Sequence, residues 1–397
     1  MEEGANESPM KKTIFIIIGI LAIIIIGGVW GYLFTYGTPK SADEVFARFG
    51  LSGGDTVSVT RTDDTVIDVT DQALDGTPQK LRQLSTRPVA GATFTKAGEV
   101  MYVEQGTGHV YSINLIDGKE TLKSGTTIPQ AIEALFSEDG TYVAITSYTA
   151  GGDQSVVYDL TMGQGSSTKG IELPLGATSI AFGKATGTLT YLLKGASGSV
   201  GYSHSIKKGV STELFKIPLR DVEVLWGEPN FVYTTPTATQ SGYLYKIKGN
   251  SLEYTTQGGQ GLVGFSYGNG VVVTRMIDGN RSVIALPNSK EETLQSLPFI
   301  PEKCTPIQGE VGSAYCAVPT NMNTGIFPDD WYKGTLTYSD ILWKMNIETG
   351  EATGVSDFLS ESGREIDVAR IGTTPDGERV WFINKNDNTL WMFDTTM

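Results

Sequence analysis

The chain of 397 residues has few of the residues on which much catalytic and metal chemistry depends. It contains two histidines and two cysteines, so a site built on clusters of these ligands is nearly excluded. Charged residues make up 19% of the chain, against about 25% in an average soluble protein. Basic residues number 30 against 44 acidic ones, for a net charge of −14. Such a balance opposes the basic face that binding to nucleic acid requires, so we expect no nucleic-acid partner.

Glycine, by contrast, is abundant. The chain has 48 glycines, and 40% of its residues are apolar. Each glycine inside a helix costs about 1 kcal/mol, which opposes a mostly helical protein. The apolar share is large enough to form a sizeable core, which opposes disorder. The composition therefore predicts an all-β protein with many turns.

One long apolar run lies near the N-terminus. Residues 14–34 carry no charge, and a helix of that length spans roughly 30 Å, the thickness of a bilayer core. We assign residues 13–36 as a transmembrane helix, residues 1–12 as a short cytoplasmic tail, and residues 37–52 as a juxtamembrane linker with a short helix. Lys11 and Lys12 precede the run and Lys40 is the first basic residue after it, which places the N-terminus inside. A cleaved signal peptide is the alternative, but its apolar region is usually shorter.

The remainder, residues 53–397, repeats one phrase, a polar turn followed by an alternating apolar strand. The turns recur about every 40 to 46 residues, the period of a four-stranded propeller blade. The last unit supplies three strands, near residues 366–372, 379–384 and 390–394, and residues 79–85 are placed to add a fourth and close the ring. The pattern predicts a seven-bladed β-propeller, or eight blades if every turn phrase is counted.

Two of these phrases are similar to those of a known family. Ser137-Glu-Asp-Gly140 and Thr374-Pro-Asp-Gly377 are each followed by a β-run, and they resemble the WD40-like repeats of TolB-type bacterial β-propellers. The resemblance covers about residues 50–397. It implies a propeller of the bacterial cell envelope, more often a binding scaffold than an enzyme, and it fixes no ligand.

The two cysteines lie in one blade. Cys304 and Cys316 fall on its first and second predicted strands, across a turn. This spacing brings two Cα atoms within disulfide range, and an extracytoplasmic location permits oxidation. We predict a disulfide; two reduced thiols that pack as small apolar residues are the alternative.

The same blade carries an inserted loop between its second and third strands. Loops on a rigid scaffold are where recognition usually resides, and this one combines aromatic with acidic side chains. We expect residues 321–339 to be the leading contact for a partner; alternatively, the loop tryptophan folds back over its own blade. The candidate binding residues are Phe327, Asp329, Asp330, Trp331, Tyr332 and Lys333.

Other motifs carry less weight. The run from Gly259 to Gly264 fits G-x-G-x-x-G without the strand–helix context of a dinucleotide site. His109 and His204 are expected to be strand residues rather than general bases.

The sequence thus predicts a single-pass protein of the bacterial cytoplasmic membrane, with its N-terminus inside and its propeller outside. We expect a non-catalytic scaffold for a protein partner in the cell envelope, without cofactor or metal. One alternative is a propeller that binds glycan or cell wall. Another is an enzyme with an unrecognised carboxylate site in the central channel. Anchored peptidases of the prolyl-oligopeptidase class also join an anchor to a propeller, but they continue into a hydrolase domain, whereas here we expect the propeller to extend to Met397.

Overall fold

A computed structural model describes residues 79–397, apart from residues 163–169, 184, 268–269, 278–279, 287–291, 295–298 and 321–324. The predicted tail, transmembrane helix and linker lie outside the described residues. The described residues belong to one compact unit, Asp64–Met397. No helix in this part of the chain is long and apolar enough to cross a membrane.

Antiparallel sheets account for nearly all of the described chain. Five of the six sheets in this part have four strands and one has seven. The first sheet along the chain consists of β2 (Val89–Phe94), β3 (Glu99–Glu104), β4 (Val110–Asn114) and β5 (Glu120–Ser124). The next consists of β6 (Ala131–Phe136), β7 (Tyr142–Thr149), β8 (Gly152–Asp159) and β9 (Ile171–Glu172), with the short 3-10 helix η1 (Leu160–Met162) before β9. It is followed by β10 (Ala177–Phe182), β11 (Thr188–Gly195), β12 (Gly198–Ser205) and β13 (Val210–Ile217).

The seven-stranded sheet follows in the sequence. It consists of β14 (Val222–Leu225), β15 (Phe231–Thr234), β16 (Ser241–Lys248), β17 (Ser251–Tyr267), β18 (Gly270–Ile277), β19 (Asn280–Leu286) and β20 (Glu292–Leu294). The last purely sequential sheet has β21 (Cys304–Pro306), β22 (Ser313–Pro319), β23 (Asp340–Asn346) and β24 (Ala352–Asp357). Three short helices accompany it, η3 (Pro301–Lys303), α3 (Asp329–Tyr332) and α4 (Phe358–Ser362).

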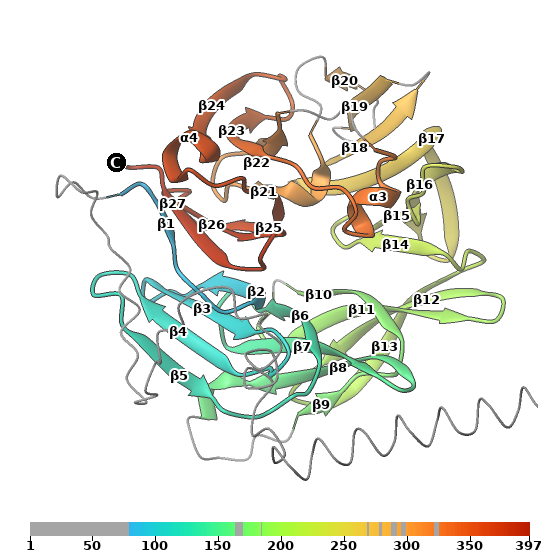
Figure 1. The fold of residues 1–397 in the computed structure, drawn as a ribbon. Coiled ribbons are helices and arrows are strands. Elements are labelled where there is room, and N and C mark those ends of the chain that lie inside the picture. The colour runs from blue at the N-terminus through green and yellow to red at the C-terminus, as the bar shows by residue number, and fades with distance from the viewer. Residues whose placement is uncertain are drawn as a thin grey trace, which may run out of the picture. The chain divides into compact units, whose positions relative to one another are not determined.

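The remaining sheet joins the two ends of the described chain. It consists of β25 (Val368–Thr373), β26 (Arg379–Asn384), β27 (Leu390–Asp394) and β1 (Leu81–Gln83). Leu81 pairs with Phe393 in the antiparallel register of β1 and β27, and Figure 1 shows blue β1 beside red β27. The prediction that residues 79–85 complete the C-terminal sheet is therefore confirmed, and this pairing leaves β27 covered on both sides.

The strand β17 changes partner along its length. Its first part pairs with β16 as far as Gln260, and its second part pairs with β18 from the same residue onward. Gly261 lies at the change, with φ of +60°, a conformation that glycine adopts without steric cost. A Cβ at this position would also lie 3.1 Å from Cδ of Pro328. The bend at Gly261 therefore lets one long strand serve two groups of strands.

The Asp-Gly phrases form the same turn in two sheets. Between β6 and β7, Oδ1 of Asp139 accepts hydrogen bonds from the backbone N of Thr141 (3.0 Å) and from Oγ of Ser137 (2.7 Å). Between β25 and β26, Oδ1 of Asp376 accepts from the backbone N of Glu378 (3.0 Å) and from Oγ1 of Thr374 (2.6 Å). The glycine that follows each aspartate has a positive φ. The aspartate thus fixes the turn through its own backbone neighbours.

Apolar clusters join each sheet to the next. One contains Phe94 and Val100 of the β2–β5 sheet with Met392 of the ring-closing sheet, and another contains Leu342 with Phe382. Further clusters join β2–β5 to β6–β9, β6–β9 to β10–β13, β10–β13 to β14–β16, and β18–β19 to β22–β23. A cluster within the seven-stranded sheet packs Leu244 against Val271. Both faces of the sheets are therefore covered, which explains why β7 reads as six successive buried residues rather than as an alternating strand.

Candidate functional site

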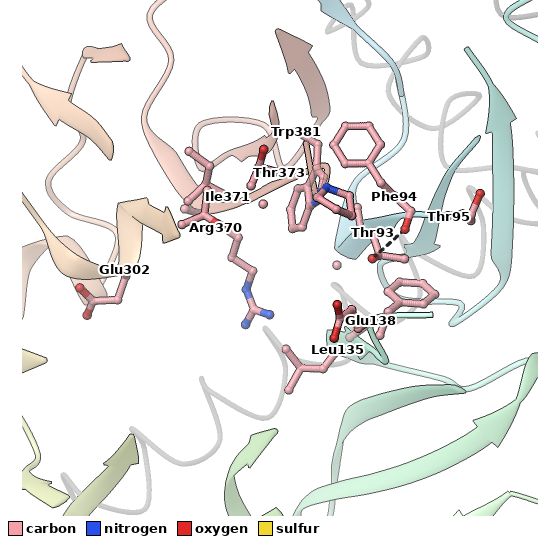
Figure 2. A pocket seen from close by; sticks show the side chains of 18 of the residues that line it. Thr93, Phe94, Thr95, Leu135, Glu138, Glu302, Arg370, Ile371, Thr373 and Trp381 are labelled. Atoms are coloured by element: carbon pink, nitrogen blue, oxygen red, sulfur yellow. Dashed lines mark hydrogen bonds between the residues drawn. The ribbon is translucent and has the colours of Figure 1, made fainter. Parts of the chain in front are cut away.

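The first strands of several sheets surround a central cavity. The strands β2, β6 and β25, which begin their sheets, lie next to one another and line a cavity of about 790 Å³. Aromatic side chains such as Phe94 and Trp381 share its lining with charged ones (Figure 2). A cavity of this size with a mixed apolar and charged lining is typical of a ligand site. We refer to it below as the central cavity.

One residue of the lining, Arg370, belongs to an ion pair. Arg370 on β25 extends its guanidinium into the open space (Figure 2), and its Nη2 lies 2.5 Å from Oε1 of Glu133 on β6. The two side chains are 35% and 39% exposed. Charges exposed to this degree are solvated and contribute about 1 kcal/mol or less to stability. The pair is therefore placed where an incoming ligand can compete for either partner.

The two ends of the cavity differ. At one end, Nε2 of Gln308 in the β21–β22 turn donates to Oε1 of Glu138 in the β6–β7 turn (3.2 Å); we call this end the turn mouth. The other end is formed by Trp331, Tyr332 and Lys385, which also line the cavity; we call it the α3 mouth. The strand β22 runs from one end to the other, because it starts after the turn with Gln308 and leads to the insertion that contains α3. The hydrogen bond between Gln308 and Glu138 therefore narrows the turn mouth and leaves the α3 mouth unaffected.

The acidic residues of the insertion hold the loop itself. Oδ2 of Asp330 accepts a hydrogen bond from the backbone N of Ile326 (2.8 Å). Oδ1 of Asp329 accepts one from the backbone N of Ala238 (2.7 Å), which ties the insertion to the β15–β16 loop. Both carboxylates are partly buried. They position α3 rather than present an open acidic surface.

The aromatic residues of the insertion divide into buried and exposed. Phe327 and Trp331 are 9% and 4% exposed and belong to a small apolar cluster, so the surface that the loop offers to a partner is smaller than the sequence predicted. Tyr332 is 47% exposed, and its hydroxyl donates a hydrogen bond to Glu302. Lys333 is exposed as well. The contact role of this loop stays a prediction, and Tyr332 and Lys333 are the residues that offer surface for it.

A buried charge cluster lies beneath Trp331. Nζ of Lys303 is 2.7 Å from Oδ2 of Asp340 and 2.5 Å from Oδ1 of Asp367, and all three side chains are fully buried. The indole Nε1 of Trp331 donates to both oxygens of Asp367, at 3.2 and 3.1 Å. The backbone N of Tyr338 also donates to Asp367 (3.1 Å). Two points of the described insertion, the Trp331 side chain and the Tyr338 backbone, are thus fastened to the same carboxylate.

The electrostatics of this cluster are asymmetric. Burial raises the pKa of the Asp340 carboxyl to about 6; the charge of Lys303 opposes that shift and the charge of Asp367 adds to it. The backbone N of Val368 donates to Asp340 (2.7 Å), which favours the ionised form. Two carboxylates facing one ammonium in a dry environment leave one negative charge uncompensated when all three are ionised. The cluster therefore favours retention of a proton at Asp340 in mild acid.

One lysine links this cluster to the cavity. Nζ of Lys385 lies 5.5 Å from the ring centroid of Trp331, and Nζ of Lys303 lies 5.4 Å from it. Burial lowers the pKa of Lys385, while the charge of Asp367 opposes the shift. The Trp331 ring is therefore close both to a buried cation and to one that lines the α3 mouth.

The cysteines lie beside this cluster. Cys304 on β21 is directly opposite Cys316 on β22 in the strand register, with a Cα–Cα distance of 4.1 Å and an S–S distance of 2.10 Å. Such a short Cα–Cα distance is typical of a non-hydrogen-bonded antiparallel pair. Because Cys304 follows Lys303, the disulfide fixes the segment that carries the buried lysine.

The glycine motif and His204 lie in strands, whereas His109 directly precedes β4 rather than lying in it. Gly259 and Gly264 belong to β17, which is not the strand–helix turn of a dinucleotide site. Nδ1 of His204 is 2.9 Å from Oγ of Ser211, and within the described part its Nε2 has no hydrogen-bond partner, so this pair lacks the third group of a catalytic relay. No three His, Cys, Asp or Glu side chains in the described chain are placed to hold a metal ion.

The sequence interpretation named Trp331 and Tyr332, which line the central cavity, but it missed Arg370 and its partner Glu133. Arg370 and Glu133 each stand within an otherwise apolar strand, VARIGT and AIEALF. A single charged residue within the otherwise apolar first strand of a sheet is a sequence signal that could have indicated both residues. Lys303, Asp340 and Asp367 have no comparable signal, because they are far apart in the sequence and meet only in the folded chain.

The described chain is similar in structure to known β-propellers. An oligogalacturonate lyase in complex with manganese matches with a TM-score of 0.54 at 11% identity, over 79% of this chain and 93% of that one. The β-propeller domain of the trilobed protease from Pyrococcus furiosus matches with a TM-score of 0.51 at 14% identity, over 77% and 96%. A mitotic checkpoint complex chain matches with a TM-score of 0.52 at 11% identity, over 80% and 95%. No protein-family model and no curated protein matches the sequence.

These likenesses show the fold alone. The chain is a β-propeller, and its neighbours include enzymes as well as proteins that are not enzymes. The fold by itself therefore favours neither a catalytic nor a non-catalytic role.

Proposed function

We propose that this chain is an extracytoplasmic β-propeller, anchored in the bacterial cytoplasmic membrane by residues 13–36, that binds a protein partner in the cell envelope through its central cavity and catalyses no reaction. The observation that carries the proposal is the cavity of about 790 Å³, with the exposed Tyr332 at one mouth and the partly exposed Arg370 in its lining. A protein segment with both apolar and charged side chains suits this lining.

The direction of entry follows from the two mouths. The Gln308–Glu138 bridge crosses the turn mouth, whereas the α3 mouth is lined by Tyr332, which the exposed Lys333 follows in the chain. A partner that enters through the α3 mouth passes Lys385 before it reaches Arg370. The insertion thus belongs to the recognition surface, although Asp329 and Asp330 serve to hold it.

The proposal includes seven blades of TolB type. The two parts of β17 pair with different neighbours, so the seven-stranded sheet supports two blades that share this strand. Together with five four-stranded sheets, that makes seven. The TolB-type assignment rests on the Ser137–Gly140 and Thr374–Gly377 phrases and on their matching turns.

Anchoring rests on the uncharged run of residues 14–34 and on the preceding Lys11 and Lys12. In the proposed topology, the full-length chain stays with membranes during alkaline carbonate extraction, and protease added outside spheroplasts digests the propeller. Release of the chain into the soluble fraction would overturn the anchor, and protection of the propeller would overturn its orientation.

Site-specific cross-linking tests the partner. We would place p-benzoylphenylalanine at Lys333 on the α3 mouth, or at the equally exposed Gln308 on the turn mouth, in the full-length chain within the cells that produce it. We expect a protein adduct from position 333 that is absent from position 308, and a severalfold lower yield when Arg370→Gln is added.

Two results contradict the proposal. If position 333 yields no protein adduct, or yields the same adducts as position 308, the α3 mouth does not receive a protein. If the purified chain releases product from an ester, peptide or glycoside substrate, and Arg370→Gln or Glu302→Gln abolishes that release, the central cavity is catalytic instead.

A further inference from the structure

A second cavity lies away from the central one, between the β10–β13 sheet and the strands β14–β17. It measures about 560 Å³. Its lining includes Arg220 and Asp221 from the connection between β13 and β14, Gln240 from the β15–β16 loop, and Tyr243 at the start of β16. We call it the tyrosine groove. Nothing in the proposed function uses it.

Three tyrosines form one wall beside this groove. Tyr243 and Tyr245 are two residues apart on β16 and so project from the same face of the sheet. Tyr245 is directly opposite Tyr254 on β17 in the strand register. The ring centroids are 6.5 Å apart for Tyr243 and Tyr245, 6.4 Å for Tyr243 and Tyr254, and 5.9 Å for Tyr245 and Tyr254. The three rings thus make one continuous aromatic surface.

This aromatic surface is open on one side. Tyr243 and Tyr254 are 41% and 54% exposed, large values for aromatic side chains. A Cβ at Gly258 would lie 2.9 Å from Cε1 of Tyr243, so the backbone of Gly258 supports that ring from below. Tyr245 packs against the apolar cluster between the two sheets. The rings are therefore held from behind while Tyr243 remains accessible from the groove.

The polar part of the groove is uncommitted. Within the described chain, no hydrogen bond or ion pair engages the side chains of Arg220, Asp221 or Gln240, and all three residues are exposed. Lys194 also lines the groove. The available groups are thus a guanidinium, a carboxylate, an amide and an ammonium beside an aromatic face.

We infer that the tyrosine groove binds a saccharide, of the class of β-linked hexose or N-acetylhexosamine oligomers. A pyranose ring with equatorial substituents has a flat face of C–H groups, which stacks on an aromatic ring, and a rim of hydroxyls. Planar polar side chains such as Asp, Arg and Gln form paired hydrogen bonds with neighbouring hydroxyls. One tyrosine face with several such groups around it matches both properties, whereas a protein hot spot is usually an apolar centre with a polar rim.

The groove also shares an end of the propeller with the α3 mouth. The β15–β16 loop, which supplies Gln240 to the groove, is bound to the insertion through the backbone N of Ala238 and Asp329. A saccharide bound in the tyrosine groove and a protein in the α3 mouth would thus be held on the same face of the molecule.

The test uses the full-length chain with cellohexaose and chitohexaose as probes and maltohexaose, an α-linked oligomer of curved shape, for comparison. Binding is followed by isothermal titration calorimetry. We expect one of the two β-linked hexamers to bind more tightly than maltohexaose. Tyr243→Ala should weaken that binding at least fivefold, the loss of one aromatic contact, while Tyr243→Phe should stay within twofold of wild type. Asp221→Asn should weaken it severalfold.

A matched control separates stacking from loss of fold. Tyr148 is 61% exposed on β7 of another sheet, and Tyr148→Ala should leave the affinity unchanged. If none of the hexamers binds at millimolar concentration, or if Tyr243→Ala binds as wild type does, the saccharide site is wrong. Preference for maltohexaose would overturn the β-linked class. Cross-linking from position 333 tests protein binding at the α3 mouth in a separate experiment. The saccharide proposal can therefore fail while the protein proposal holds, and the reverse is also true.

Discussion

Two of the propeller's groupings of basic with acidic side chains differ in their surroundings. Lys303, Asp340 and Asp367 are fully buried and make direct contacts with one another. Arg370 and Glu133 also touch directly, but more than a third of each side chain remains exposed, and Arg370 lines the central cavity. The same pairing of charges therefore serves two purposes: the buried cluster fixes the insertion in place, and the exposed pair remains available to a ligand.

Removing the buried cation should have the largest effect. Lys303→Met leaves two carboxylates without their partner in a site that water does not reach, and breaking a buried pair in this way costs about 3–5 kcal/mol. We expect that loss in the free energy of unfolding from urea denaturation. Lys333→Met, which removes an exposed lysine of the insertion, should change it by about 0.5 kcal/mol or less.

A triple variant sharpens this prediction. Adding Asp340→Asn and Asp367→Asn to Lys303→Met removes the unpaired charges, so part of the lost stability should return. A loss below about 1 kcal/mol for Lys303→Met alone would mean that the cluster adapts, by proton uptake or by movement of Trp331, and does not lock the insertion.

The pH dependence of the buried cluster gives a second comparison. The folded-state pKa of Asp340, about 6, is above its ordinary value of 3.8. Its contribution to stability is therefore fully present below about pH 4 and is lost as the pH rises through about 6. As the pH rises from about 4 to above 6, wild type should therefore lose stability relative to Asp340→Asn. We expect this loss in unfolding free energy to be no more than about 3 kcal/mol.

Chemical denaturation at a series of pH values measures that difference. Folding lowers the pKa values of three other carboxyls, those of Asp139, Asp376 and Asp394. Their contribution to stability therefore rises with pH. It does so equally in wild type and Asp340→Asn, so it cancels in the difference. A difference that is constant between pH 4 and pH 6.5 would show that Asp340 does not titrate there.

The disulfide beside the cluster should contribute somewhat less. A bridge that closes a loop of this length is worth about 2–3 kcal/mol, since it restricts the unfolded chain. We expect Cys304→Ser combined with Cys316→Ser to lower the unfolding free energy by that amount, and reduction of the wild-type chain to do the same. A mass measurement of the Cys304 peptide without reductant checks the bond directly; two free thiols in chain isolated from the cell envelope would contradict it.

Much of the architecture could be predicted because it is local. The Asp-Gly turns at Asp139 and Asp376 use only their own neighbours, so four adjacent residues suffice to recognise them. The ring closure was predictable for a related reason: three C-terminal strands lacked a fourth, and residues 79–85, immediately before the first complete unit, were placed to supply it. The insertion between β22 and β23 was visible as an irregular interval in the same repeat.

The sites depend on contacts that no local pattern records. Trp331 was read as a residue for a partner or as a cover over its blade, and its burial follows from Asp367, a residue 36 positions away. Asp329 looked like part of an acidic surface, yet it accepts a hydrogen bond from Ala238, 91 positions away. Such pairs form where different blades meet, and the repeat that predicts the blades does not encode which side chains meet between them.

The exposed pair should contribute less to stability than the buried cluster or the disulfide. Arg370→Gln removes one partner of a solvated ion pair, so we expect the unfolding free energy to change by about 1 kcal/mol or less. Its effect on binding should be larger than its effect on folding, because Arg370 extends into the cavity that a partner enters. Both effects can be measured on the same variant. The cross-link yield from position 333 reports partner binding, and the urea midpoint reports stability. If Arg370→Gln lowers the unfolding free energy as much as Lys303→Met does, both groupings stabilise the fold. Arg370 would then have a structural role and would not be free to bind a partner. If the yield falls while the midpoint holds, the exposed charge belongs to recognition and the buried ones to support.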